Sequence, residues 1–133
     1  MRVYVSAPIA CQEQAREIGR WLETELGHSL SCRWLFIDNI GYDTDRTPES
    51  YKAAAIMDLE DVAACDMLIL LAPYKSFGAP VEFGYALALG KKVLSIGPFL
   101  GVFQYHPHVT FVEMPAEDLF LAARPKLVEL LFE

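Results

Sequence analysis

The strongest constraint on the fold of this chain is its regular alternation of short apolar runs with longer helix-like segments. Residues 67–72 are apolar throughout, which is typical of a parallel strand buried on both faces. The other strand-like runs are residues 3–6, 28–37, 92–96 and 109–112. Helix-like segments are expected at residues 12–26, 48–64, 78–90 and 115–132. This order predicts a parallel sheet that helices cover on both faces.

We therefore predict an α/β fold of the Rossmann-like or flavodoxin-like type, a three-layer sandwich around a five-stranded parallel sheet. The 133 residues are 53% hydrophobic and 22% charged, without a long linker or repeat, so one domain over residues 1–133 is expected. Sheets of this type bind ligands at the carboxyl ends of their strands. Three loops should meet there, namely those after Ser6, after Phe36 and over residues 73–78.

Local signals set the expected helix boundaries. Thr47 is a suitable cap and Pro48 a suitable first residue for the second helix. Gly27 and Gly90 are stop signals for the first and third helices. Pro125 is expected to kink or divide the last helical segment, because proline lacks the backbone N–H that a helix interior needs.

Composition limits the classes of partner. A net charge of −7 repels nucleic acid and anionic lipid, which disfavours duplex binding and a role at the membrane surface. No apolar run reaches the roughly 20 residues of a membrane span, and the sequence begins directly with a strand pattern. The chain has three cysteines, an odd number, and it is large enough to fold without disulfide bonds. We therefore expect the cysteines to be reduced thiols in the core. A cytoplasmic protein that binds a small polar molecule is predicted.

Glu82 is the most informative single residue, because it is the lone charge in the helix that starts after Gly78. A helix that is apolar all round is expected to be buried. A carboxylate in its first turn would be held by free backbone N–H groups and the helix dipole, ready for chemistry in a dry place. The alternative is a simple helix stabiliser or a partner of Lys75 or Lys91.

A second carboxylate, Asp58, flanks the buried face of the preceding helix. At 100° per residue it lies beside Tyr51, Ala54 and Val62, whereas Asp61 is predicted to point to the opposite, polar side. A carboxylate among apolar groups must find donors or raise its pKa, and either outcome suits acid–base work. The alternatives are a local cap or an ion pair with Lys52 or Arg16.

Enzymes that cleave a glycosidic bond commonly use two carboxyl groups, one as nucleophile and one as proton donor. Glu82 and Asp58 are expected on elements that flank one strand and could form such a pair. The sequence resembles the nucleoside 2-deoxyribosyltransferases and the related nucleotide N-glycosidases. The resemblance rests on three runs, Val3-Tyr4-Val5-Ser6-Ala7-Pro8-Ile9, Asp58 to Asp66, and Gly78 through Glu82 to Val93. These runs extend over residues 3 to about 96.

The resemblance implies catalytic roles for three residues. Glu82 would attack the anomeric carbon, Asp58 would serve the departing base or the ribose, and Tyr4 would orient the nucleophile. Tyr4 has a plain alternative as an aromatic residue of a core strand. The implied reaction is a retaining double displacement on a 2′-deoxynucleoside or its 5′-monophosphate, through a covalent glycosyl-enzyme.

The substrate-binding candidates are Ser6, Ser76, Gly78, Trp34 and Phe36. Transferases of the resembled family often have an aspartate where this chain has Ser76, and a serine suits a phosphate better than a ribose diol. The glycosidase branch shares that serine but favours glycine and arginine in the first loop, where this chain has only Ile9-Ala10-Cys11. Trp34, Phe36 and Phe77 are candidates to stack on the base, and each is equally suited to the core.

We predict no cofactor and no metal. His106 and His108 lack a third ligand at useful spacing, and the acidic run with Asp38, Asp43 and Asp45 lacks the spacing of a calcium loop and is expected to be an exposed loop. The first turn lacks the glycines of a dinucleotide or Walker loop. Because related enzymes complete their sites across subunits, a homo-oligomer is expected. The alternative function is a nucleotide-sensing module of the same fold without turnover.

Overall fold

The computed structural model describes residues 1–37 and 47–132. In these ranges the chain forms one parallel sheet of five strands, in the order β2-β1-β3-β4-β5. The strands are β1 (Arg2–Ser6), β2 (Ser29–Leu30), β3 (Met67–Leu71), β4 (Lys92–Gly97) and β5 (Val109–Glu113). The predicted α/β class, parallel sheet and strand number are confirmed.

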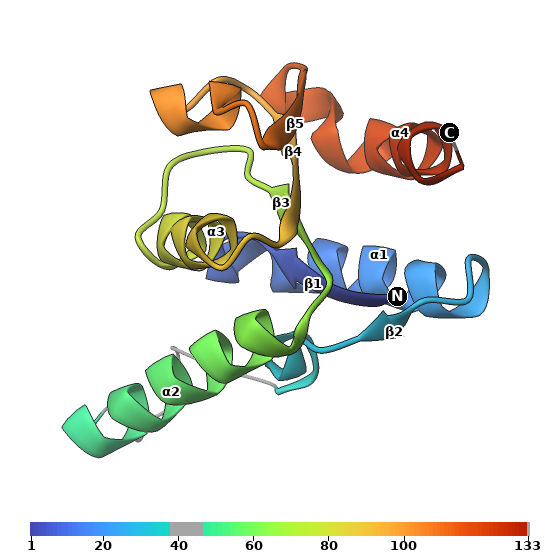
Figure 1. The fold of residues 1–133 in the computed structure, drawn as a ribbon. Coiled ribbons are helices and arrows are strands. Elements are labelled where there is room, and N and C mark those ends of the chain that lie inside the picture. Colours follow the sequence, from blue (N-terminus) through green and yellow to red (C-terminus); the bar gives the residue numbers. More distant parts are fainter. Residues whose placement is uncertain (38–46, 133) are drawn as a thin grey trace.

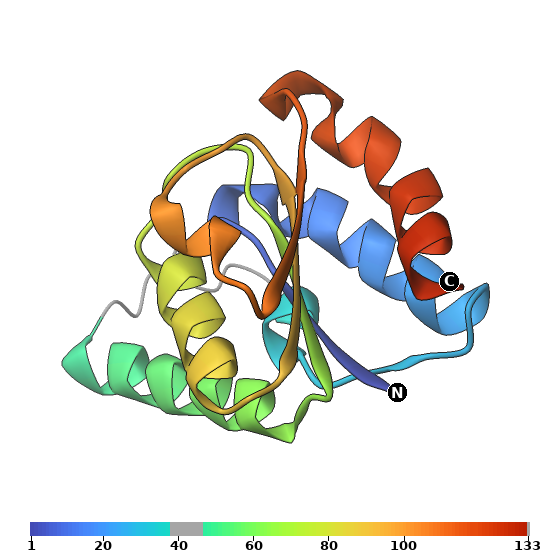
Figure 2. The same ribbon diagram turned by 45° about the horizontal axis from the view of Figure 1, so that its top comes forward.

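Four α-helices cover the sheet in two layers. They are α1 (Gln12–Thr24), α2 (Pro48–Ala64), α3 (Gly78–Ala88) and α4 (Leu119–Leu131). Helices α1 and α4 lie on one face, and α2 and α3 lie on the other, which makes the predicted three-layer sandwich (Figures 1 and 2). The amino-terminal half of α2 extends past the edge of the sheet in both views.

The core lies along the two central strands. All five residues of β3 are buried, as the continuous apolar run predicts, and each buried Leu, Ile or Met side chain contributes about 1.5–3 kcal/mol to folding. The strand order reverses between β1 and β3, so the loops after these two strands diverge to opposite sides. This divergence opens the crevice in which doubly wound sheets place their ligands.

The second predicted strand is wrong for most of its length. Only Ser29–Leu30 pairs with β1, and Arg33–Phe36 form a short 3-10 helix instead. Side-chain contacts hold that turn, since the Trp34 indole Nε1 donates to the Val5 carbonyl at 2.9 Å. β-favouring side chains were present in the segment, but tertiary contacts overrode their local preference.

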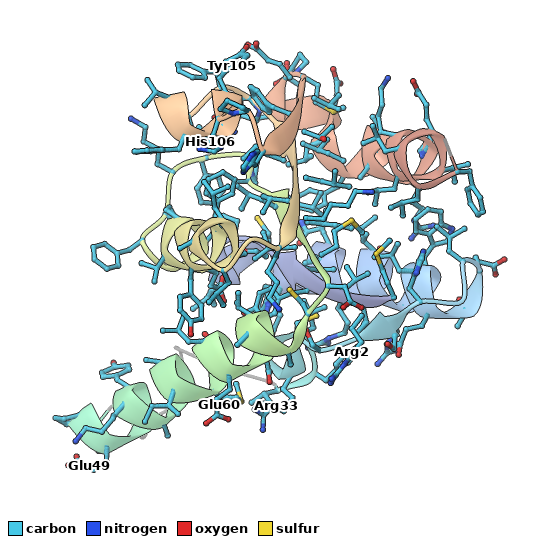
Figure 3. The ribbon with its side chains drawn as sticks, viewed as in Figure 1. Arg2, Arg33, Glu49, Glu60, Tyr105 and His106 are labelled. Atoms are coloured by element: carbon cyan, nitrogen blue, oxygen red, sulfur yellow. The ribbon has the colours of Figure 1, made fainter. Side chains whose placement is uncertain are left out.

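The predicted orientation of Asp61 is also wrong. Its carboxylate is buried, and it accepts hydrogen bonds from the backbone N–H and the Nε of Arg33 at 3.0 Å. Figure 3 shows Arg33 beside Glu60, which forms a longer ion pair with the same guanidinium at 3.4 Å. Asp61 therefore fastens the 3-10 turn to α2, and the helix projection could not reveal this because its partner lies far away in sequence.

The predicted start of the second helix is confirmed. Thr47 caps α2 in a reciprocal capping box with Ser50, and Pro48 is its first residue, as predicted. The predicted 115–132 segment becomes a short 3-10 turn, Ala116–Asp118, followed by α4. Pro125 does not divide α4, which runs unbroken through it, because the buried Leu119, Ala123 and Leu127 pack the helix on the molecule.

Three further predictions concern the cysteines, the acidic run and membrane-spanning segments. The three cysteines, Cys11, Cys32 and Cys65, are buried free thiols, as expected. The acidic run with Asp38, Asp43 and Asp45 lies outside the described residues. Within the described ranges, no helix is both long enough and apolar enough to cross a membrane.

Candidate active site

A cavity of about 710 Å³ opens where the carboxyl ends of β1 and β3 diverge. The loop after β1, the end of the 3-10 turn at Ile37 and the loop after β3 all contribute to its lining, as the sheet topology predicts. The projecting half of α2 forms its outer wall through Tyr51 and Ala54. Glu82 from α3 and Asp58 from α2 line the same cavity.

Two hydroxyl groups hold the Glu82 carboxylate. The Tyr4 hydroxyl donates to Oε2, and Ser6 Oγ donates to Oε1 at 2.9 Å. Both donors come from β1, where alternate residues face the same side of the sheet, so Tyr4 and Ser6 point together toward α3. Each carboxylate oxygen thus has a fixed hydroxyl donor, which orients the side chain within its pocket.

The predicted support of Glu82 by the helix end is wrong. Glu82 is the fifth residue of α3, past the first turn, and the hydroxyls of β1 hold it instead. The helix is not buried all round either, because Val81 and Leu89 on its outer side are 48% and 46% exposed. The inner face, with Ala79, Glu82, Phe83 and Ala86, is buried.

Burial dominates the electrostatics of Glu82. It raises the pKa of Glu82 to about 8, the negative charge of Asp58 adds to the rise, and the hydrogen bonds from Tyr4 and Ser6 oppose it. Burial and the neighbouring carboxylates hold the pKa of Tyr4 well above its usual range, so Tyr4 remains a proton donor to the carboxylate. Such perturbed carboxyl groups in a cavity are typical of functional sites.

Asp58 also faces the cavity, with a lower pKa than Glu82 and with one oxygen that has no hydrogen-bond donor among the described residues. Burial raises its pKa to about 6, repulsion by Asp61 contributes, and the positive charge of Arg33 opposes the rise. Its Oδ1 is buried without a hydrogen-bond partner among the described residues. A buried polar atom without a partner is costly, so this oxygen is placed to meet a group that enters the cavity.

The remaining sequence candidates divide into two groups. Ser76, Gly78 and Trp34 line the cavity, and Ser76 Oγ is a second buried atom without a partner among the described residues. Ser6 is fully buried behind Glu82 and contacts the carboxylate instead of lining the cavity. Phe36 lies outside the lining, exposed beneath the Arg20 guanidinium at 5.6 Å.

Several lining residues were not candidates from the sequence, among them Met57, Tyr74 and Ile37. Met57 precedes Asp58 on α2, so its position next to a singled-out carboxylate was the available signal. Phe77, a candidate either to stack on the base or to pack in the core, lies in the lining and is largely exposed, so it is not a core residue. Among the described residues, no group of three His, Cys, Asp or Glu side chains is arranged to hold a metal ion.

Replacing Glu82 with glutamine is expected to flatten the pH dependence of stability between pH 6 and 8. The folded protein keeps the Glu82 proton up to about pH 8, whereas the ordinary pKa is 4.5. Unfolding therefore releases this proton, and its stabilising effect is lost as the pH rises, by up to about 1.4 kcal/mol per pH unit. Urea unfolding at pH 6, 7 and 8 measures the slope.

The matched control for this experiment is Glu117→Gln, which removes an exposed carboxylate on the 3-10 turn before α4. It should keep the slope of the parent protein. In the parent protein Asp58 affects stability over a lower range, between its ordinary pKa of 3.8 and its folded pKa of about 6. Equal slopes for Glu82→Gln and its parent would contradict the buried, protonated state of Glu82.

Comparison with known proteins shows the fold. The chain is similar to the CMP N-glycosidase BcmB from Clostridium botulinum, with 19% identity and a TM-score of 0.60 over 95% of this chain and 99% of that one. It is also similar to a conserved protein from Enterococcus faecalis V583, with 17% identity and a TM-score of 0.59 over 96% and 99% of the two chains. No family model and no curated protein sequence matches the chain.

Proposed function

We propose that this protein cleaves or transfers the N-glycosidic bond of 2′-deoxynucleosides or their 5′-monophosphates through a covalent glycosyl-enzyme on Glu82. The observation that carries the proposal is the pair of carboxyl groups in one cavity, Glu82 fixed by two hydroxyls and Asp58 with a free oxygen. A sensor that only binds has no need of a nucleophile held in this way. The proposal agrees with the sequence resemblance.

The reactive form of the pair carries a single proton, on Asp58, and leaves Glu82 ionised. In the first step an oxygen of this Glu82 carboxylate attacks C1′ of the sugar as the bond from C1′ to the base nitrogen breaks. The electron pair of that bond leaves with the base, and the Asp58 carboxyl group supplies a proton to it, directly or through one water. Tyr4 and Ser6 keep the carboxylate of Glu82 oriented toward the sugar. The product is a glycosyl ester of Glu82.

In the second step an acceptor attacks C1′ from the face that the base has left, and the ester bond to Glu82 breaks. Water as the acceptor loses its proton to the Asp58 carboxylate and gives hydrolysis, whereas a second base gives transfer. Both carboxyl groups return to their starting states. The two inversions retain the configuration at C1′.

The structural neighbour from Clostridium botulinum supports the reaction class, because it is a CMP N-glycosidase with the same fold. At 19% identity the likeness leaves the sugar and base open, so ribonucleotides belong in any test of this chain. The wide cavity, lined by Trp34, Tyr51 and Met57, has apolar and aromatic surface for a flat base. The homo-oligomer expected from the resemblance stays part of the proposal.

The test is a substrate panel. Deoxynucleosides, their 5′-monophosphates and CMP are incubated with the protein, with and without a free acceptor base, and base release and exchange are followed by chromatography. We expect release or exchange with at least one deoxy compound. Binding measured by thermal stabilisation, with no turnover across the panel, would instead identify a nucleotide-sensing module and overturn the proposal.

A further inference from the structure

A second cavity, of about 900 Å³, lies beside the first, between α3 and the 3-10 turn Val102–Tyr105. Three residues, Tyr74, Ser76 and Ala79, line both cavities, so the two spaces share a wall at the loop after β3. Most of the second cavity is apolar, with Phe83 and Leu87 of α3 on one side. The proposed reaction does not use this space.

The two cavities are lined by ionisable side chains of opposite type, acidic in the first and basic in the second. Among the described residues, Asp58 and Glu82 are the only charged side chains that line the first, and no Lys, Arg or His does so. The second is lined by Lys75, His106 and His108, and no described Asp or Glu lines it. The chain has a net charge of −7, so three basic side chains around one cavity run against its overall charge and indicate a site for an anion.

The wall of the second cavity is built rigidly around Gln104. Its Nε2 donates to Ser95 Oγ at 3.1 Å and to the Pro98 carbonyl at 3.2 Å. Its Oε1 accepts from the backbone N–H groups of Leu100 and Gly101 at 2.6 and 3.2 Å. All four hydrogen-bonding positions of this buried amide are thus used by β4 and the loop that follows it, so the cavity is formed before any ligand arrives.

The His106 ring is arranged to donate a hydrogen bond. His106 Nδ1 accepts the backbone N–H of His108 at 3.0 Å, so the neutral ring carries its proton on Nε2 and retains a donor. The two rings meet edge to face, with their centroids 5.2 Å apart. Figure 3 shows His106 on the side of the 3-10 turn that faces α3, and Tyr105 on the outward side.

We infer that the second cavity holds the phosphate end of the substrate, with Lys75, His106 and His108 as its partners, so that the substrate is a nucleotide rather than a nucleoside. This inference rests on the proposed function. A phosphate in the first cavity would face two carboxyl groups and no described Lys, Arg or His, and an ionised carboxylate there would repel it. Ser76, whose Oγ is buried without a partner among the described residues, lines both cavities.

The experiment compares matched pairs of deoxynucleoside and 5′-monophosphate by kcat/KM and by calorimetric Kd. The parent protein should favour the monophosphate. Lys75→Gln should weaken Kd and lower kcat/KM for the monophosphate by about 10- to 100-fold and leave the nucleoside values unchanged. Lys92→Gln is the matched control, since this exposed lysine lies at the amino end of β4, away from both cavities.

A second variant, His106→Asn with His108→Asn, should also lose affinity for the monophosphate alone, and the amide oxygen at position 106 can still accept the backbone N–H. Equal preference for the monophosphate in the parent protein and in Lys75→Gln would overturn the inference and leave the proposed function standing. If no compound is turned over, the proposed function fails, and the calorimetric Kd still decides the subsite. Monophosphate binding that Lys75→Gln abolishes supports the subsite, and unchanged or absent binding overturns it.

Discussion

Glutamine in place of Glu82 is expected to lower kcat by about 10³-fold or more on any nucleotide or nucleoside that the protein turns over. The amide is a poor nucleophile, yet it has nearly the same shape and can still bond to the Tyr4 and Ser6 hydroxyls, so the fold and the cavity should persist. Base release in steady-state assays measures the loss. Calorimetry of substrate binding to the same variant separates lost chemistry from lost binding.

The exposed Glu117→Gln is again the matched control, and it should turn over substrate like the parent protein. Residual activity of Glu82→Gln within about tenfold of the parent would show that Glu82 is not the nucleophile. That result would leave Glu82 as a structural carboxyl group held by two hydroxyls.

Asparagine in place of Asp58 is expected to lower kcat by about 10²- to 10⁴-fold, the usual contribution of a positioned general acid. The loss should depend on the leaving group, because a base that departs readily without a proton needs no acid. A series of nucleotides with bases of different pKa measures this dependence. Asp118→Asn, an exposed aspartate before α4, is the control. A loss that is the same for every base would contradict the acid role.

The same pair of groups predicts a bell-shaped pH profile. The Asp58 and Glu82 carboxyl groups have pKa values of about 6 and about 8, so kcat/KM should rise through the lower value and fall through the higher one. These two values belong to the coupled pair in the free protein. Asp58→Asn should remove one limb of the profile, and an unchanged bell would show that other groups titrate.

Sequence reasoning succeeded where one local rule was sufficient. The continuous apolar run over residues 67–72, of which 67–71 form β3, and the capping residues Thr47 and Pro48 behave as their patterns indicate. Sheet topology then predicts which loops converge. The two carboxyl groups, Asp58 and Glu82, were found because charges stood out against apolar helix faces, and they line one cavity.

Prediction from sequence failed where contacts between residues far apart in the chain determine the local structure. Asp61 was assigned to solvent because a helix projection cannot include Arg33, which is 28 residues away in sequence and folds beneath α2. The 3-10 turn that carries Arg33 was predicted as a strand for the same reason. Ser6 was expected to meet the substrate, and no pattern could indicate that its hydroxyl instead supports Glu82 from behind.

The most direct test of the central claim is to trap the covalent intermediate. A substrate with fluorine at C2′ should slow the breakdown of the glycosyl ester, because fluorine opposes positive charge at C1′ in the transition state. Intact-mass spectrometry should then show an increase by one fluorinated sugar unit, and peptide mapping should place it on Glu82. A turned-over substrate that leaves no adduct, or an adduct on another residue, would contradict the role proposed for Glu82.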